Sequence, residues 1–396
     1  MTLDSWLTRL ESLSPTEIVL GLDRTHAVLE HLDVGRPPHV LHIGGTNGKG
    51  SSVAMLSTLL RRGGYRTGAY TSPHLIRYNE RIAVDGNPVA DDEIIRAFER
   101  IEAARTDVPL TYFEFGTLAA LLVFCANDVD VAIFEVGLGG RLDAVNAIDP
   151  DAALITSIAL DHQEWLGESR EEIAREKAGI MRAGRPVVYA DTDRPASIDT
   201  AARDIGARLL ARGRDFACDA GEHTWTWRGV GHSLPELAMP SIQGKVQLNN
   251  AAGVLTLLEA AGFDNVLDVQ TVSDGLASIE LRGRMQSFQD SHRWRFDVAH
   301  NPAAATALAS SLELTGQSRR VAVVGMLDDK DVEGIAGALA SQVDEWIAVE
   351  AQSQRAIPAP ELARRIANEL NRHCEIASSI REALVAARGR AGEEGE

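Results

Sequence analysis

The sequence is poor in cysteine, in long apolar runs and in net positive charge. Its three cysteines, Cys125, Cys218 and Cys374, show no paired spacing, which excludes a thiolate zinc site of the usual kind and suits a reducing compartment. No apolar run reaches the ~20 residues that span a bilayer. The N-terminal residues include an acid and no basic stretch, unlike a secretory signal. A net charge of −18 argues against nucleic-acid binding. We therefore expect a cytoplasmic protein with neither nucleic-acid nor membrane partners.

The composition is otherwise that of a globular protein, with 45% apolar and 24% charged residues in a chain of 396. That length favours two domains, or three, at roughly 150 residues each. Short apolar runs that alternate with amphipathic stretches predict an α/β fold with a mostly parallel sheet. Strands are expected over 40–43, 129–134 and 152–156, and helices over 51–62, 115–127 and 171–182.

A second α/β block begins near Arg284. The pattern breaks over 281–293, where Arg-Gly-Arg is followed by a polar run. Beyond the break, strands are expected over 294–298 and 320–324, and Pro302 is placed to open a helix. We therefore predict a first domain over 1–283 and a smaller α/β domain over 284–396.

A glycine-rich segment, Gly44-Gly-Thr-Asn-Gly-Lys-Gly-Ser51, stands between a predicted strand and a predicted helix. Glycines let backbone N–H groups turn toward phosphates, the helix N-terminus adds positive charge, and Lys49 can reach the outer phosphates. Two positions depart from the usual phosphate loop: Ile43 stands where a glycine is expected, and Gly50 separates Lys49 from Ser51. The alternative is a glycine-rich turn with a surface lysine, but the order of strand, loop and helix favours phosphate binding.

Three other titratable side chains are candidates, each with a simpler alternative. Glu135 follows a predicted strand, and ligands bind at the carboxyl ends of strands in open α/β sheets. Taken alone, however, it is as well suited to capping a helix or turn. His162 taken alone is more often structural or solvated. Lys177 lies on a predicted helix among charged neighbours, where a solvated lysine is the simpler interpretation.

The glycine-rich segment resembles the loop of the folylpolyglutamate synthase and dihydrofolate synthase family, within the wider Mur ligase group. Further blocks occur in the family's order: Tyr70-Thr-Ser-Pro-His-Leu75, Thr111-Tyr-Phe-Glu-Phe-Gly-Thr117, Glu135-Val-Gly-Leu-Gly-Gly-Arg-Leu-Asp-Ala144, Thr156-Ser-Ile-Ala-Leu-Asp-His162, Glu176-Lys-Ala-Gly-Ile180, Phe296-Asp-Val-Ala-His-Asn-Pro302 and Gly325-Met-Leu-Asp-Asp-Lys-Asp331. The resemblance implies a P-loop domain followed by a smaller Rossmann-like domain, as in Mur ligases. Family members continue with a strand and a Gly-Ser-Phe segment, whereas this sequence stops at Glu396. Either its C-terminus is truncated or its second domain ends differently.

The resemblance also implies an ATP- and magnesium-dependent ligase that works through an acyl phosphate. The counterparts of Ser72, Glu135 and His162 are magnesium ligands, although imidazole is an unusual partner for an ion that prefers oxygen. The counterpart of Lys177 is carbamylated and helps to hold a second magnesium ion, which requires a neutral amine that burial or nearby cations favour. Lys49, Lys177 and His162 are therefore the expected catalytic residues.

Binding residues are assigned by the same resemblance. Nucleotide contacts are expected from both domains: Asn47, Gly48, Lys49, Gly50, Ser51, Asn250, Arg284, Asp297 and His300. Asn249 is the neighbouring alternative to Asn250, and helix capping is the alternative role of Asp297 and Asn301. Pteroate contacts are expected from Thr111, Tyr112, Phe113, Glu114, Leu142, Asp143, Ala144 and His74. By residue type alone the aromatic side chains are core and Asp143 is a turn residue. In the family context, the aromatic faces pack on a flat pterin and Asp143 accepts its hydrogen bonds.

The expected reaction joins L-glutamate to dihydropteroate and extends the glutamate tail of reduced folates such as tetrahydrofolate, in a monomer that closes on its substrates. A dedicated folylpolyglutamate synthase is one alternative. A non-catalytic P-loop regulator is another, and it would need the loop but not Glu135, His162 or Lys177. A peptidoglycan-precursor Mur ligase is disfavoured, because the 43 residues before Gly44 are too few for a uridine-nucleotide domain.

Overall fold

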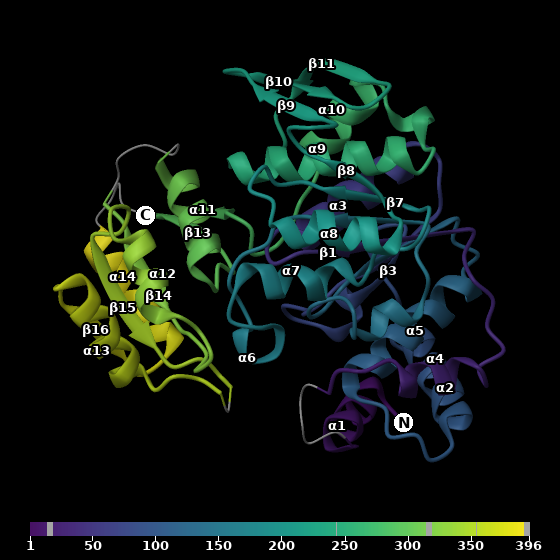
Figure 1. Ribbon diagram of the computed structural model, residues 1–396. Helices are drawn as coiled ribbons and strands as arrows, with labels where there is room; N and C mark the ends of the chain where they lie inside the picture. Colours follow the sequence, from purple (N-terminus) through teal and green to yellow (C-terminus); the bar gives the residue numbers. More distant parts are fainter. Residues whose placement is uncertain (14–18, 243, 314–318, 354, 392–396) are drawn as a thin grey trace. The chain divides into compact units, whose positions relative to one another are not determined.

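The computed structural model describes residues 1–13, 19–242, 244–313, 319–353 and 355–391, which form two compact units (Figure 1). The first unit comprises Met1–Ala159, Gln163–Ser241 and Gln247–Ile279. The second comprises Leu160–His162, Ile242–Val246 and Glu280–Glu396. The second unit thus contains two short segments that lie far earlier in the sequence than its main body.

An eight-stranded sheet organises the first unit, in the order β4-β3-β2-β5-β1-β6-β7-β8. Its strands are β4 (Asn87–Pro88), β3 (Ile82–Val84), β2 (Thr67–Tyr70), β5 (Val131–Glu135), β1 (His39–Gly44), β6 (Ala152–Ile155), β7 (Pro186–Tyr189) and β8 (Arg208–Ala211). Neighbours from β2 to β8 pair in parallel, whereas β3 and β4 add an antiparallel edge. The residues of β5 and β6 are buried throughout, as expected for parallel strands covered on both faces.

Helices cover both faces of this sheet. They are α1 (Leu3–Leu13), α2 (Asp23–Leu29), α3 (Lys49–Arg62), η1 (Tyr78–Arg81), α4 (Asp91–Arg105), α5 (Tyr112–Ala126), η2 (Ala144–Ala147), α6 (Gln163–Leu166), α7 (Arg170–Ala178), α8 (Ala196–Ile205), α9 (Lys245–Ala260), η3 (Asp264–Val266) and α10 (Val269–Ala277). On one face α9 approaches β6, since the position of a β-carbon on Gly253 would lie 3.1 Å from Leu154 Cδ1.

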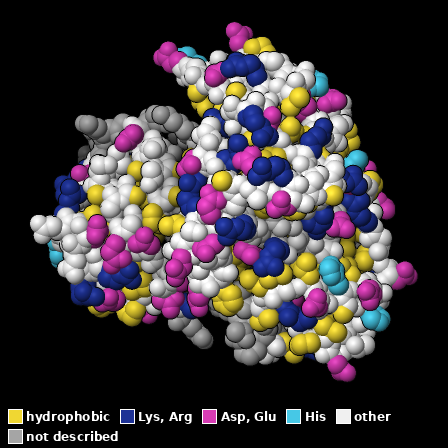
Figure 2. Space-filling model, viewed as in Figure 1, with side chains coloured by type: hydrophobic (Ala, Val, Ile, Leu, Met, Phe, Trp, Pro, Cys, Tyr) yellow, Lys and Arg dark blue, Asp and Glu magenta, His cyan; other side chains and the backbone are white. Residues whose placement is uncertain are grey.

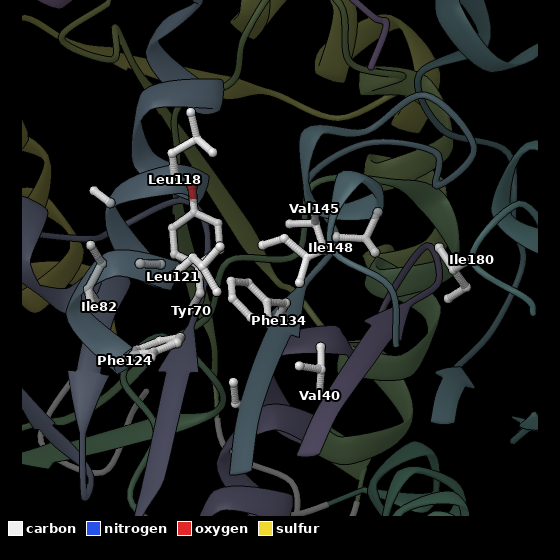
Figure 3. Packing of buried hydrophobic residues seen from close by; sticks show 14 of the residues in the cluster. Val40, Tyr70, Ile82, Leu118, Leu121, Phe124, Phe134, Val145, Ile148 and Ile180 are labelled. Atoms are coloured by element: carbon white, nitrogen blue, oxygen red, sulfur yellow. The ribbon is translucent and has the colours of Figure 1, made fainter. Parts of the chain in front are cut away.

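The opposite face carries the larger described core, in which α5 is central. Figure 3 shows Tyr70 and Phe134 of the sheet packed near Leu118 and Leu121 of α5. The helix is apolar almost all round because the sheet covers one side and α1 and α4 cover another. Thr111 caps its first turn through a capping box with Glu114, which marks where the helix begins.

A three-stranded antiparallel sheet in the same unit was not foreseen from the sequence. It consists of β9 (Ala217–Ala220), β10 (Thr224–Arg228) and β11 (Ser233–Ala238), with β11 packed on α10 (Figure 1). The alternation of Trp225 and Trp227 with polar residues is the signal for it, because alternate strand residues share a face. Both tryptophan side chains are fully buried.

The second unit is an α/β layer of its own. A parallel sheet of β14 (Val321–Val324), β15 (Glu345–Val349) and β16 (Cys374–Ala377) packs against α11 (Pro302–Glu313), α12 (Val332–Leu339) and α13 (Ala359–Leu370) on one side and α14 (Ile380–Ala391) on the other. The strand expected over 294–298 is β13 (Arg293–Phe296), which pairs with β12 (Gln286–Gln289) in a separate antiparallel hairpin. The short turn at 290–292 brings these two strands together and explains this difference from a continuous α/β alternation.

The predicted elements around the glycine-rich segment are confirmed to within two residues at each end for β1, α3, β5 and β6. Among the described residues, no helix is long and apolar enough to cross a membrane. On the face drawn in Figure 2, basic and acidic side chains are interspersed. The predicted α/β architecture, with a mostly parallel sheet followed by a smaller α/β unit, is therefore confirmed.

Candidate active site

The glycine-rich segment forms a tight loop between β1 and α3. Gly48 has φ 87°, a left-handed conformation that favours glycine, and α3 begins at the next residue. Gly45 leaves room for Thr156, because a β-carbon on Gly45 would lie 1.9 Å from Thr156 Oγ1. The Thr156 hydroxyl donates to the carbonyl oxygen of Asn47 at 2.6 Å and so ties β6 to the loop.

Two lysines reach the carbonyl groups of this loop. Lys49 Nζ donates to the carbonyl oxygens of Gly45 and Thr46, each at 3.1 Å. Lys177, from α7, is buried and donates to the same Gly45 oxygen at 2.9 Å. Both lysines were expected to be catalytic from the family resemblance, and the first unit brings their Nζ atoms to one backbone oxygen.

Asn250 lies against the loop from α9. Its side chain is buried, and its amide nitrogen donates to Gln247 at 3.1 Å. The neighbouring Asn249 is only partly buried. Of the two asparagines weighed from the sequence, Asn250 is therefore the one whose amide group approaches Gly48.

Glu135 ends β5 and meets both the loop helix and Ser72. Its carboxylate accepts a hydrogen bond from the Ser72 backbone N–H at 3.4 Å and lies 3.7 Å from the β-carbon position of Gly50. At the residue after Gly50, the Ser51 hydroxyl is buried and has no hydrogen-bond partner among the described residues. The described part of the chain contains no group of three or more His, Cys, Asp or Glu side chains placed to hold a metal ion. A metal at this edge would therefore depend on hydroxyl and phosphate oxygens besides Glu135.

His162 belongs to the second unit, where Asp161 gathers polar side chains. His162 has φ 51°, and its backbone N–H donates to Asp161 Oδ1 at 3.0 Å. The other Asp161 contacts are Asn301 Nδ2 at 2.9 Å, His300 Nε2 at 3.4 Å and Lys330 Nζ at 3.5 Å. Burial alone would raise the pKa of Asp161, but the hydrogen bond from His300 and the nearby cations hold it below its usual range.

The sequence analysis quoted the motifs that contain Asp161 and Lys330 but assigned no role to either. The signal was present, because an acid in one motif and a base in another are candidates for an ion pair. Nothing local to either block, however, indicates that the two blocks meet. Asn301 has the capping role that was considered for it. Its amide oxygen accepts the Ala304 N–H at 2.9 Å and so caps α11.

Arg284 and Asp297 lie near each other in the second unit, on either side of the β12–β13 hairpin. The Asp297 carboxylate accepts the Met285 N–H at 2.9 Å and the Ala299 N–H at 2.8 Å, so it fixes two turns instead of capping α11. Arg284 donates to the carbonyl oxygen of Gly283 at 3.1 Å and is only partly buried.

Phe113 and Asp143, two of the expected pteroate contacts, come together at Gly137. A β-carbon there would lie 2.6 Å from the Phe113 ring and 3.2 Å from Asp143 Oδ2, so only glycine permits this approach. The buried Asp143 carboxylate accepts backbone N–H groups from Leu138 at 2.8 Å and Val145 at 2.9 Å. Burial raises the pKa of Asp143 to about 6, against the opposing effect of those N–H groups.

The other expected pteroate residues divide between structural contacts and an aromatic cluster. Thr111 and Glu114 form a buried capping box at the start of α5, and Arg24 makes an ion pair with Glu114 at 2.8 Å. Leu142 accepts the Gly21 N–H through its carbonyl oxygen, and Ala144 begins η2. The Tyr112 and His74 rings both pack near Tyr78. Arg24 was not among the predicted residues, and its guanidinium donates hydrogen bonds to both carboxylate oxygens of Glu114.

The fold and this loop define a Mur ligase. The chain matches the model of the Mur ligase middle domain over residues 43–217 and that of the Mur ligase, glutamate ligase domain over residues 283–395. The similarity then narrows to one branch. The chain is 42% identical to the dihydrofolate synthase/folylpolyglutamate synthase of Escherichia coli strain K12, covering 92% of this chain and 86% of that protein. It is 38% identical to the protein of the same description from Haemophilus influenzae, with the same coverage.

Solved structures give the same result. The structure of E. coli FolC in complex with DHPP and ADP has a TM-score of 0.93 and 40% identity, covering 100% of this chain and 93% of that one. The Yersinia pestis bifunctional folylpolyglutamate synthase/dihydrofolate synthase with Mn, AMPPNP and L-glutamate has a TM-score of 0.90 and 39% identity, with coverage of 99% and 93%. The chain therefore belongs to the dihydrofolate synthase/folylpolyglutamate synthase family and is a ligase.

Proposed function

We propose that this chain is an ATP-dependent ligase that adds L-glutamate to dihydropteroate and to the glutamate tail of reduced folates. Membership of the family carries this proposal, since the relatives at 42% and 38% identity are described with both activities. A related structure holds DHPP and ADP, and another holds Mn, AMPPNP and L-glutamate. In such a reaction the substrate carboxylate takes the terminal phosphate of ATP, and the amino group of glutamate then displaces phosphate from the acyl phosphate.

ATP would be held by Asn47, Gly48, Lys49, Gly50 and Ser51. The support is the left-handed turn at Gly48, the start of α3 at Lys49 and the Asn250 amide beside them. A helix N-terminus and successive backbone N–H groups bind phosphate oxygens, and the Lys49 ammonium supplies charge. In the second unit, Arg284, Asp297 and His300 are the proposed nucleotide contacts.

A magnesium site fits the residues present at the end of β5. Buried hydroxyl groups normally find a hydrogen-bond partner, and the Ser51 oxygen has none among the described residues. This oxygen and the Glu135 carboxylate, which lies near the adjacent Gly50, suit a hard cation. Ser72, Glu135 and His162 are the proposed protein ligands, with Ser51 as a further oxygen. A bound divalent ion would neutralise the charge that develops on the transferred phosphate.

Lys177 is proposed to hold a second magnesium ion as a carbamate. Its amine is buried beside Lys49, and an environment of low polarity with a second cation favours the neutral amine that reacts with carbon dioxide. The carbamate would turn a cationic side chain into an anionic one. The lysine would then act on the metal and not directly on the substrate.

The pteroate group is proposed to bind at Phe113 and Asp143. The Phe113 ring and the buried Asp143 carboxylate both approach Gly137, and an aromatic ring near a carboxylate suits a flat heterocycle with N–H donors. Tyr112, Leu142, Ala144 and His74 are the further proposed contacts. Thr111 and Glu114 would act indirectly, by fixing the start of α5 that carries Tyr112 and Phe113.

The decisive experiment measures phosphate release from ATP by the purified chain. We expect release that depends on L-glutamate together with dihydropteroate, and also on L-glutamate together with tetrahydrofolate, in a monomeric protein. If phosphate is released with L-glutamate and tetrahydrofolate but not with L-glutamate and dihydropteroate, the chain is a dedicated folylpolyglutamate synthase. ATP binding without substrate-dependent release would contradict the proposal and favour a nucleotide-binding regulator.

A further inference from the structure

The loop between β2 and η1 has a fixed backbone although two adjacent apolar side chains on it are exposed. Leu75 is 50% exposed and Ile76 is 70% exposed. The backbone N–H groups of Leu75, Ile76 and Arg77 nevertheless all donate to the carboxylate of Glu80, at 2.8, 3.2 and 3.0 Å. One side chain therefore receives three successive N–H groups of the loop.

Successive N–H groups that point inward form a concave anion site, and here the chain fills it with its own carboxylate. Hydrogen bonds to a charged acceptor are stronger than those between neutral groups. A loop that otherwise lacks a hydrogen-bonded ladder is thereby restricted to one backbone shape. The side chains of Leu75 and Ile76 project from that shape with half or more of their surface exposed.

Arg81, the residue after Glu80, holds the His74 side chain of the same loop in place. Its Nε donates to His74 Nδ1 at 2.9 Å, and its guanidinium carbon lies 5.4 Å from the ring centroids of both Tyr78 and Tyr112. An arginine N–H is always a donor, so His74 Nδ1 is the acceptor and His74 Nε2 carries the proton.

We propose that Glu80 is a positioning residue for the pteroate or folate substrate. Its three hydrogen bonds hold the loop so that Leu75 and Ile76 meet an aromatic part of the substrate while His74 Nε2–H is offered as a donor. The side of the loop that carries His74 also contacts Tyr78, which packs against Tyr112 at the start of α5. This inference rests on the proposed function, because it takes the substrate class from there.

The test compares Glu80→Ala and Glu80→Gln with a matched control, Glu259→Ala. The Glu259 carboxylate also accepts three successive backbone N–H groups, from Val230, Gly231 and His232 at 2.8, 2.6 and 2.8 Å, but at the β10–β11 turn. We expect Glu80→Ala to raise the KM for dihydropteroate at least about tenfold with an unchanged KM for ATP, and Glu80→Gln to restore part of the loss. Glu259→Ala should change neither KM.

Hydrogen exchange of the Leu75, Ile76 and Arg77 amides supplies the second measurement. We expect exchange there to accelerate at least about tenfold in Glu80→Ala and not in Glu259→Ala. Faster exchange with an unchanged KM for dihydropteroate would overturn the positioning role, and unchanged exchange would overturn the hydrogen-bond argument itself. If Glu80→Ala fails to fold, Glu80→Gln carries both measurements.

Failure of this inference is distinguishable from failure of the proposed function. A wild-type chain that shows no glutamate-dependent phosphate release contradicts the function. Equilibrium binding of dihydropteroate to the wild-type chain and to the Glu80 variants then still tests the loop, and equal dissociation constants would overturn the inference.

Discussion

The amide oxygen of Asn250 lies 2.7 Å from the position that a β-carbon would take on Gly48. Gly48 is also in the left-handed conformation, with φ 87°. The loop therefore requires glycine here for two separate reasons, backbone conformation and space. A second glycine separates the two effects, because Gly64 has the same φ and nothing within 4 Å of its β-carbon position.

We predict that Gly48→Ala weakens ATP binding at least about tenfold, because the loop must shift to admit the methyl group against Asn250. Gly64→Ala carries the conformational strain alone, so it should lower the free energy of unfolding by about 1–2 kcal/mol without a change in ATP affinity. Titration calorimetry with ATP and urea denaturation of both variants check this pair. Equal ATP affinities for the two variants would contradict the proposal that close contact between Gly48 and Asn250 is needed for ATP binding.

Removal of the Ser51 hydroxyl should weaken the use of magnesium without lowering the free energy of unfolding. Ser51→Ala eliminates a buried hydroxyl group that has no hydrogen-bond partner in the part of the chain that the structure describes. The free energy of unfolding without magnesium should therefore stay constant or rise by about 1 kcal/mol. The magnesium concentration that gives half-maximal activity should rise at least about tenfold. Ser52→Ala is the control, since that hydroxyl donates to the carbonyl oxygen of Gly48 at 3.0 Å. A magnesium requirement that stays at the wild-type value in Ser51→Ala would exclude this oxygen from the metal site.

Carbamylation of Lys177 is open to direct detection. After equilibration with ¹³C-bicarbonate we expect a carbamate signal by NMR that Lys177→Ala abolishes, together with a loss of turnover of at least about 100-fold. Assignment is simplified because the sequence contains four lysines, Lys49, Lys177, Lys245 and Lys330. Lys330→Arg serves as the control and should keep the signal. Full turnover in Lys177→Ala would rule out the proposed second metal ligand.

The raised pKa of Asp143 predicts the pH dependence of substrate binding. A carboxylate with a pKa of about 6 is ionised above that pH and protonated below it, so its full capacity to accept hydrogen bonds is lost as the pH falls through 6. The KM for dihydropteroate should therefore rise about tenfold from pH 7 to pH 5, while the KM for ATP changes less. Asp143→Asn should show a high KM with little dependence on pH in this range. A flat profile for the wild type would remove Asp143 from the pteroate site.

His42 predicts how stability depends on pH. Burial lowers the pKa of His42 to about 3, and neither ring nitrogen has a hydrogen-bond partner among the described residues. The unfolded chain protonates this histidine below its ordinary pKa of 6.5, whereas the folded chain stays neutral until about pH 3. Stability is therefore lost progressively as the pH falls from 6.5 toward 3.

For His42, the loss amounts to about 2 kcal/mol between pH 7.5 and pH 5. His42→Leu should flatten the dependence of the free energy of unfolding on pH by that amount in urea denaturation. His39→Leu, at a more exposed position of the same strand, should keep the wild-type dependence. If the free energy of unfolding depends on pH equally in His42→Leu and in the wild type, His42 does not cause the loss of stability.

The sequence predicted well those features that depend on neighbouring residues. The β1 strand, the glycine loop and α3 follow from an apolar run, from glycines and from a helical period that adjoin one another. The opening of α11 at Pro302 was predicted in the same way. The helix expected over 115–127 begins earlier, at Tyr112, behind a cap at Thr111 that was not predicted. The β9–β11 sheet was missed because its strands are short and pair with each other, so its only local signal is the alternation at Trp225 and Trp227.

The local sequence and the motif order determined the fold class, the position of the phosphate loop and the family of ligases. The tertiary structure alone decided which groups meet: the Lys177 side chain with the Gly45 carbonyl group, the Glu135 side chain with the Ser72 N–H group, and the Asp161 side chain with those of Asn301 and Lys330. Each pair joins segments more than sixty residues apart, at 132 residues for Lys177 and Gly45. Their meeting depends on the order of parallel strands and on how helices pack against them, and neither property is encoded within a single segment.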